Sequence, residues 1–132
     1  MDKAYSRLLI AACCLTLPSC AEAECQLPRG WVLARNLKPS PIPYTPNPLF
    51  SAQEVAAGQC VWNGKKGDLD ALLKDLVVVQ SLNPQPRLLF DFAKSVDCAE
   101  LKRVRAQIAK AAHCSPDRPC VEGSAAEFEA TS

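Results

Sequence analysis

The sequence predicts an all-α fold: a small disulfide-stapled domain of about four short helices, preceded by a signal peptide and an extended proline-rich arm. Apolar residues recur at helical spacing within residues 68–82 and 97–112. Six of the eleven prolines lie within residues 25–50, which confines the helices of the domain to the part of the chain that follows. Eight cysteines among 132 residues supply the staples that so small a domain needs.

Export is indicated by the first residues of the chain. Lys3 and Arg7 precede an uncharged, mostly apolar segment, residues 8–17. This is the pattern of a secretory signal peptide. A membrane-spanning helix needs about 20 apolar residues, so this segment is too short to be one. Small residues at positions 21 and 23 predict cleavage there, which defines residues 1–23 as the signal peptide.

A second processing route involves Cys20. Residues Leu17–Cys20 resemble a bacterial lipobox, in which residues 1–19 are removed and Cys20 receives a lipid. Soluble export is favoured, because Pro18 fits that pattern poorly. A lipid on Cys20 would be the only membrane attachment expected. The protein is therefore expected to be periplasmic or secreted, with a membrane-anchored lipoprotein as the alternative.

Residues 24–50 are predicted to form an extended arm. Each proline fixes its own φ and biases the preceding residue towards extended structure, so the segment favours a stiff polyproline-like conformation. Trp31, Ile42 and Tyr44 are its candidate partner-binding side chains. The alternative is an arm that lies on its own domain, tied near Cys25.

Residues 51–120 are predicted to form the helical domain, whose first helix covers residues 52–62. Ser51 lies three residues before Glu54, which is the spacing of a capping box. An Asn-Gly pair then ends this helix.

The second helix, within residues 68–82, is expected at the centre of the domain. Asp68 is its predicted cap, and apolar side chains lie on two sides with only a narrow polar strip around Lys74. The helix is therefore expected to be buried by neighbours on two sides. Three consecutive valines keep a strand as the alternative, because β-branched residues favour strands.

The remaining elements follow the second helix. Residues 87–96 fit either a helix or a strand, and the helical neighbours favour a helix. Residues 97–112 are clearly amphipathic, with Asp97 as the predicted cap and an apolar stripe opposite a basic face. Residues 121–132 are predicted to be a flexible acidic tail.

Five cysteines remain after processing, an odd number in an oxidising compartment. Cys98 and Cys114 lie at opposite ends of one predicted helix, about 24 Å apart, so they cannot bridge. A local bridge between Cys114 and Cys120 is expected. Cys60 and Cys98 are the natural long-range pair, which leaves Cys25 unpaired or in a disulfide-linked dimer. A rival pairing joins Cys25 to Cys60 or Cys120.

No catalytic, cofactor-binding or metal site is predicted. His113, the only histidine, is adjacent to Cys114, and neighbouring helical residues point about 100° apart, so the two do not form a catalytic dyad. The sequence contains no Cys-x-x-Cys, glycine-rich phosphate loop or Gly-x-Ser-x-Gly motif. A net charge of +1 gives no electrostatic case for binding nucleic acid.

These observations predict an exported, non-enzymatic binding or assembly accessory protein of the cell envelope, with another protein as its partner. The alternative is a periplasmic inhibitor or immunity protein that blocks the active site of another protein, and a small secreted enzyme ranks third. In size, export signal and helix-cysteine plan the chain resembles small exported accessory proteins of bacterial envelopes, such as secretion pilotins and periplasmic immunity proteins. No motif assigns it to either family.

Overall fold

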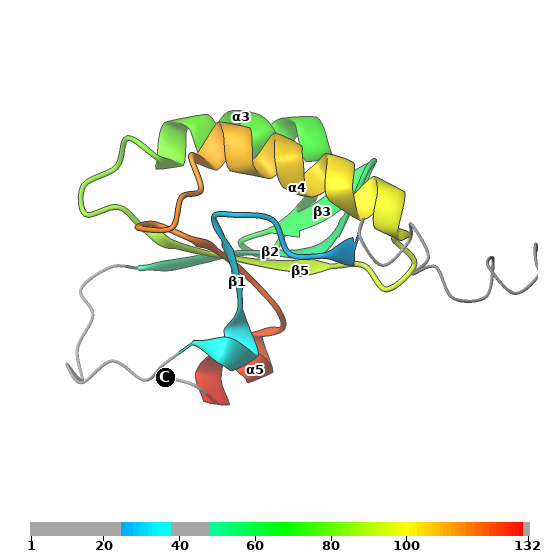
Figure 1. Cartoon of the computed structure of the whole chain (residues 1–132). Helices are drawn as coiled ribbons and strands as arrows, with labels where there is room; N and C mark the ends of the chain where they lie inside the picture. The colour runs from blue at the N-terminus through cyan, green and yellow to red at the C-terminus, as the bar shows by residue number, and fades with distance from the viewer. Residues whose placement is uncertain (1–24, 38–47, 131–132) are drawn as a thin grey trace, which may run out of the picture.

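The computed structural model describes residues 25–37 and 48–130, and these form an α/β fold rather than the predicted all-α fold (Figure 1). The prediction of a helical domain is therefore wrong. In chain order the elements are β1 (Trp31–Leu33), the 3-10 helix η1 (Ala34–Asn36), β2 (Leu49–Ala56), β3 (Gln59–Trp62), β4 (Lys65–Gly67), α3 (Leu69–Val79), β5 (Arg87–Phe92), α4 (Cys98–Ala112), β6 (Cys120–Glu122) and α5 (Ala125–Ala130).

One six-stranded mixed sheet organises the described residues, in the order β1-β6-β5-β2-β3-β4. The first four strands of this order are parallel, whereas β3 and β4 are antiparallel to their neighbours. Helices α3 and α4 cover one face of the sheet, and α5 with η1 covers part of the other (Figure 1). The parallel strands and the helices between them explain why the fold is α/β.

The main core lies between the sheet and the helix pair α3 and α4. Its most deeply buried side chains include Leu76, Phe90 and Ile108, each with no exposed surface. A smaller cluster on the opposite face joins Ala34 to three further apolar residues, namely Leu89, Val121 and Phe128. Strand β5 contributes to both clusters, because successive side chains of a strand point to opposite faces.

Two predicted helices are confirmed, together with their caps. The side chain of Asp68 accepts a hydrogen bond of 2.8 Å from the backbone N–H of Ala71 at the start of α3. Asp97 does the same for the N–H of Glu100 at the start of α4, also at 2.8 Å. Both contacts satisfy amide groups that a helix leaves unpaired at its first turn.

The predicted helix over residues 52–62 is wrong, because this segment forms most of β2 and all of β3. A bulge between Gln53 and Ala56 breaks the alternation that would have indicated a strand, and Glu54 adopts a left-handed φ of 52° there. Asn63 and Gly64, with φ values of 49° and 84°, form the turn of the hairpin between β3 and β4 rather than the end of a helix.

The helix favoured over residues 87–96 is also wrong, and the strand alternative describes the structure. β5 lies between β6 and β2 and is covered on both faces. A strand buried on both faces is apolar without alternation, which makes its sequence hard to distinguish from that of a buried helix. The burial of Leu88, Leu89 and Phe90 in succession shows this directly.

The ends of the predicted domain are parts of the fold. The predicted tail begins inside β6, a strand between β1 and β5, and continues into α5, where Phe128 is 6 % exposed. The predicted arm contains β1 and the start of β2. The prediction of a stiff extended arm falls largely on residues 38–47, which lie outside the described residues.

Two disulfides join cysteines of the described chain. Cys114 and Cys120 are bridged, as expected, with Cα atoms 5.3 Å apart. Cys25 is bridged to Cys98, with Cα atoms 4.9 Å apart, and Cys60 is a free thiol buried on β3. The structure therefore differs from the expected Cys60–Cys98 pair and from an unpaired Cys25. The reason is that residues 59–62 form a strand beneath α3, not a helix whose end could meet the start of α4.

Candidate interaction surface

The sheet has two ends of different character, defined by the direction of its central parallel strands. At the carboxyl end, β2 and β5 finish and α4 begins. At the other end, β2 and β5 begin while α3 and α4 finish (Figure 1). We call this second end the apolar end; it comprises residues 48–49, 77–87 and 113–119.

Large apolar side chains are exposed at the carboxyl-terminal turn of α3. Val77 is 52 % exposed, Val78 is 62 % exposed, and Leu82, just beyond the helix, is 44 % exposed. The helix buries one face only, through Leu69, Leu72, Leu76 and Val79. The expectation that this helix is buried on two sides is therefore wrong. Leu49, at the start of β2, is the remaining large hydrophobic residue exposed among those described, at 38 %.

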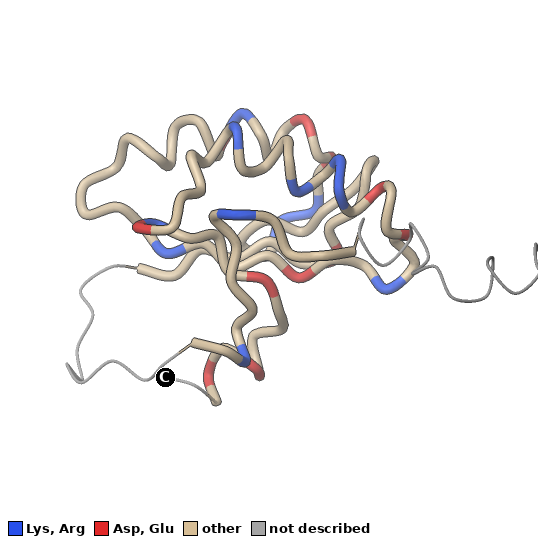
Figure 2. Tube along the Cα trace, in the orientation of Figure 1, with Lys and Arg blue, Asp and Glu red and all other residues tan. Residues whose placement is uncertain are grey.

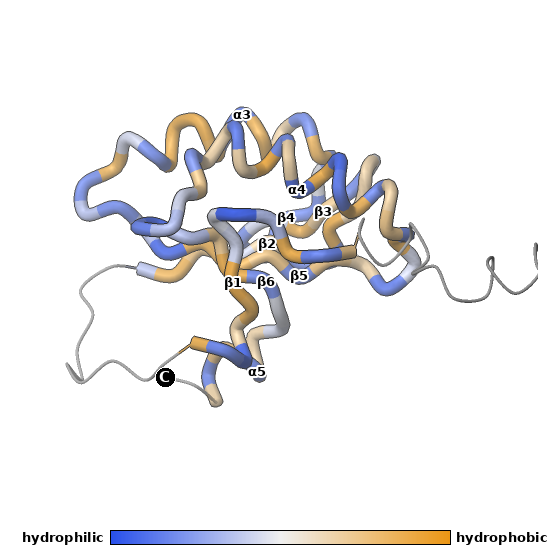
Figure 3. The backbone as a smooth tube through the Cα atoms, in the orientation of Figure 1, coloured by the Kyte–Doolittle hydropathy of each residue, from blue (hydrophilic) through white to orange (hydrophobic). Residues whose placement is uncertain are grey.

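The longest segment of this end is uncharged up to Pro86. The eleven residues from Leu76 to Pro86 contain no Asp, Glu, Lys or Arg. Figure 2 shows the corresponding uncharged stretch over the end of α3 and the loop that leads to β5, and Figure 3 shows apolar positions on the same helix. Exposed apolar residues without interspersed charges are typical of surfaces that contact other macromolecules.

The loops of the apolar end are held in place by several contacts. The backbone N–H groups of Ser115 and Arg118 each donate to the carbonyl of the other residue, at 3.1 Å, which closes a tight turn within the Cys114–Cys120 bridge. The guanidinium of Arg118 donates to the side-chain oxygen of Gln85, which joins this loop to the one before β5. Ordered loops cost less conformational entropy when they bind a partner.

Gly30 allows the disulfide loop to pack closely against the start of β1. Its φ is +88°, and a Cβ atom there would lie 2.9 Å from the carbonyl oxygen of Cys114. The carbonyl of Gly30 also accepts a hydrogen bond of 2.9 Å from the N–H of Cys120. Close backbone approach of this kind requires glycine.

The carboxyl end is closed instead. In many α/β proteins, ligands bind outside the carboxyl ends of the strands. Here the first turns of α3 and α4 are capped by aspartates, and the carboxylate of Glu100 accepts a hydrogen bond of 2.7 Å from the N–H of Ala57, beyond β2. The Cys25–Cys98 bridge ties the start of the described chain to the start of α4. The backbone N–H groups of Ala57, Ala71 and Glu100 are thus already used.

A buried ion pair joins three further segments near the carboxyl end of the sheet. Arg105 is 4 % exposed, and its guanidinium donates two hydrogen bonds, of 2.8 and 2.7 Å, to the carboxylate of Glu122 at the end of β6. It also donates to the backbone carbonyls of Cys25 and Gln26, at 3.4 Å. Arg105 therefore links α4, β6 and the segment that precedes β1.

The free thiol of Cys60 is not a reactive site. Its Sγ atom lies in the main core and donates to the carbonyl oxygen of Asp68 at 3.5 Å. Burial raises the pKa of the thiol above its ordinary value, and the charges of Asp68 and Asp75 raise it further. A thiol held in its protonated form is a poor nucleophile, so Cys60 acts as a small core residue.

The predicted partner-binding residues are placed as follows. The side chain of Trp31 is 5 % exposed and packs against Phe90 and Phe92, with ring centroids 5.5 and 6.0 Å apart, so this side chain lies in the core and is not displayed to a partner. Ile42 and Tyr44 lie outside the described residues, as does Cys20. The sequence did offer a signal for the surface that the structure exposes, because Val78 and Leu82 lie opposite the buried stripe of their helix.

His113 lies at the apolar end, where Asp117 is the one carboxylate among the residues that define it. His113 is exposed, has a left-handed φ of 55° and closes the carboxyl end of α4. Within residues 25–37 and 48–130, no group of three His, Cys, Asp or Glu side chains is placed to hold a metal ion. Over the same ranges, no helix has the length and hydropathy to cross a bilayer.

The fold and this surface together define a small α/β protein with two disulfides and an exposed apolar end. Comparison with models of known protein families, with curated proteins and with solved structures finds no match in any of the three.

Proposed function

We propose that the protein is an exported, non-enzymatic accessory protein that binds another protein of the cell envelope through its apolar end. The observation that carries this proposal is the exposure of Val77, Val78 and Leu82 within an uncharged segment. Large apolar side chains gain free energy when a partner removes them from water, about 25 cal/mol for each Å² buried. The two bridges support the export that the first residues of the chain indicate, because disulfides persist in oxidising compartments.

The proposal is tested by site-specific photo-crosslinking in the native host. A photoreactive residue in place of Val78 should give a discrete crosslinked species, whereas one in place of Gln59, exposed on β3, should give none. Replacing both Val78 and Leu82 by serine should reduce the crosslinked species measured from Leu49 at least tenfold. The Lys74→Ser variant, also exposed on α3, is the matched control. Equal crosslinking from Gln59 and Val78 would contradict the proposal.

A specific observation also favours the inhibitor alternative. The Cys114–Cys120 loop presents Pro116 and Asp117 at an exposed, internally hydrogen-bonded tip, and rigid loops of this kind suit insertion into a cleft. This function predicts a one-to-one complex that silences an exported hydrolase. Replacing Pro116 by glycine should then weaken inhibition more than the paired serine substitutions at Val78 and Leu82 do, and an enzyme unaffected by the protein would exclude this function for that enzyme.

A further inference from the structure

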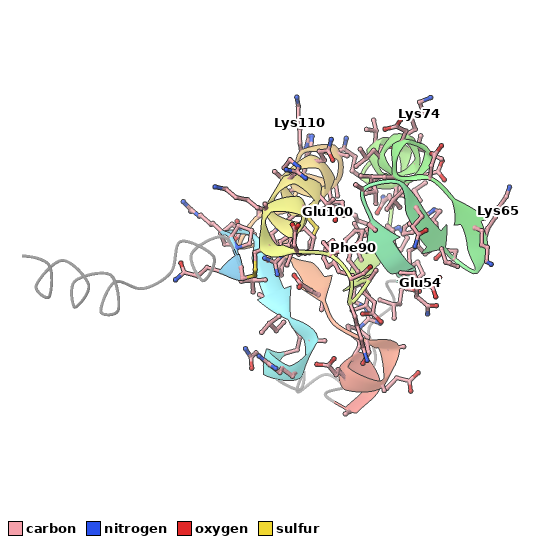
Figure 4. The ribbon with its side chains drawn as sticks, turned by 90° about the vertical axis from the view of Figure 1, so that its right-hand side faces the viewer. Glu54, Lys65, Lys74, Phe90, Glu100 and Lys110 are labelled. Carbon is pink, nitrogen blue, oxygen red and sulfur yellow. A yellow bond between two sulfur atoms is a disulfide. The ribbon has the colours of Figure 1, made fainter. Side chains whose placement is uncertain are left out.

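The two edge strands of the sheet, β1 and β4, differ in the charged side chains that they carry. An edge strand exposes backbone N–H and C=O groups that another strand can pair with, and proteins discourage this with charged side chains, proline or very short strands. The outer strand β4 contains Lys65 and Lys66, and all of its residues are exposed. Figure 4 shows Lys65 at the outermost position of that edge. The opposite edge strand, β1 (Trp31–Leu33), is as short as β4, so the two edges differ in side chains alone: β1 has no charged residue or proline.

The register of β1 shows which of its backbone groups face outward. Val32 is paired with Val121 of β6, and the carbonyl of Gly30 accepts from Cys120, so these two positions turn their backbone groups towards β6. Alternate residues of a parallel strand turn their groups to opposite sides. Trp31 and Leu33 therefore face the open edge.

Local structure uses one of these outward groups. The N–H of Trp31 donates to the carbonyl of Pro28 at 3.2 Å. The carbonyl of Trp31 and the N–H of Leu33 remain available, because no residue that the structure describes pairs with the outer side of β1. These two groups match the N–H and C=O that one residue of an added strand presents.

Charge around this edge selects the class of peptide. The described segment from Cys25 to Leu37 carries Arg29 just before β1 and Arg35 just after it, both exposed, and it contains no Asp or Glu (Figure 2). Glu122 on the neighbouring strand is engaged by Arg105. Helix α5, which packs on η1, carries acidic residues, so Arg29 should contribute more to selectivity than Arg35.

We propose that the outer edge of β1 is a second interaction site, which binds an extended acidic peptide segment of a partner protein as an added strand. Backbone pairing through Trp31 and Leu33 supplies the docking geometry, and Arg29 and Arg35 favour carboxylates at the ends of the peptide. This site does not depend on the apolar end, so a negative result at one site does not contradict the proposal for the other.

The test uses the exported chain with both disulfides intact and a synthetic hexapeptide, Glu-Thr-Val-Thr-Val-Glu, with blocked ends. Binding is followed by NMR through the amide signals of β1, with the same peptide carrying Lys in place of Glu as the comparison. The Leu33 amide signal should shift saturably, and the acidic peptide should bind about five-fold more tightly, the size of effect that two exposed ion pairs supply. Replacing Arg29 and Arg35 by glutamine should equalise the two peptides.

One substitution isolates the backbone contact. Leu33 has a φ of −82° and follows a strand residue, so proline fits there and removes only the outward N–H. The Leu33→Pro variant should lose peptide binding at least tenfold, whereas Leu33→Ala, which loses a similar amount of packing, should retain it. Peptides that leave the amide signals of β1 unchanged, or that bind equally to both variants, would overturn the proposal.

Discussion

The two ends of the sheet differ in what their exposed groups can still do. At the carboxyl end, two aspartate caps and the hydrogen bond from Ala57 to Glu100 occupy three backbone N–H groups, and the Cys25–Cys98 bridge fixes the start of α4. At the apolar end, hydrogen bonds also hold the loops, but Val77, Val78 and Leu82 remain exposed to solvent. Satisfied polar groups close a site, whereas unburied apolar groups leave one open.

The comparison also separates two uses of a disulfide. Cys25–Cys98 joins residues 73 apart and connects the first described residue to a helix of the main core. Cys114–Cys120 joins residues six apart and shapes a surface loop. A bridge that closes a long loop restricts the unfolded chain more than one that closes a short loop. The first bridge is therefore expected to stabilise the fold, and the second to shape the apolar end.

The largest expected effect is the loss of the Cys25–Cys98 bridge. Replacing both cysteines by alanine should lower the free energy of unfolding by about 4 kcal/mol in the loop-entropy treatment. Urea denaturation of the variant and the parent measures this difference. Cys60→Ala is the matched control, because it also removes a sulfur but no bridge. An unfolding midpoint equal to that of the parent would contradict the structural role given to the carboxyl end.

The next effect concerns the ion pair that links α4 to β6. Glu122→Ala leaves the buried guanidinium of Arg105 without its carboxylate and should cost about 3 kcal/mol, at the lower end for a broken buried pair because Arg105 keeps two backbone carbonyls. Combining Arg105→Met with Glu122→Leu should recover most of this loss. Chemical denaturation of the parent and of these two variants measures the loss and its recovery. A double variant no more stable than Glu122→Ala would argue against an unpaired charge as the cause.

The sequence predicted the helices of the structure better than its strands. Caps at Asp68 and Asp97 are local contacts, so their spacing in the sequence was sufficient to locate α3 and α4. Strands depend on partners that are distant in sequence, and two local features hid them. The bulge at Glu54 removed the alternation of β2, and the burial of both faces removed that of β5.

The candidate surface was predictable only in part for the same reason. The sequence places Val78 and Leu82 opposite the buried stripe of α3, but only the position of the helix decides whether a neighbour covers them. No described element packs on the side of α3 that faces away from the sheet, so Val78 and Leu82 are exposed. The pairing of Cys25 with Cys98 likewise depends on where the segment that precedes β1 meets α4, which no spacing in the sequence specifies.

A smaller effect is expected for the bridge of the apolar end. Replacing Cys114 and Cys120 by alanine should cost about 2 kcal/mol of stability, because the loop they close is short. The same variant should reduce crosslinking from Val78 by more than this loss of folded protein explains, since the fraction folded is measured in parallel by circular dichroism. Full crosslinking by the folded variant would show that the loop takes no part in the interaction.

The smallest expected effect concerns the charge of Asp91, a partly buried carboxyl near the carboxyl end of the sheet. Burial raises the pKa of the Asp91 carboxyl, on β5, above 3.8; the charges of Glu127 and Glu122 raise it further and Lys94 lowers it. The folded protein therefore holds this proton more tightly than the unfolded chain does. Stability should fall as the pH rises from 3.8 through the pKa of the folded state, and the penalty is complete above that pKa.

Asp91→Asn removes this penalty and should raise the melting temperature slightly at pH 7, with the gain disappearing below pH 3.8. Because Asp91 is partly exposed, solvent screening keeps the effect below about 1 kcal/mol. Lys94→Gln is the control of opposite sign: it removes the charge that lowers the pKa, so it should reduce the melting temperature at pH 7. A gain from Asp91→Asn that is equal at pH 7 and pH 3 would assign the effect to packing rather than to charge.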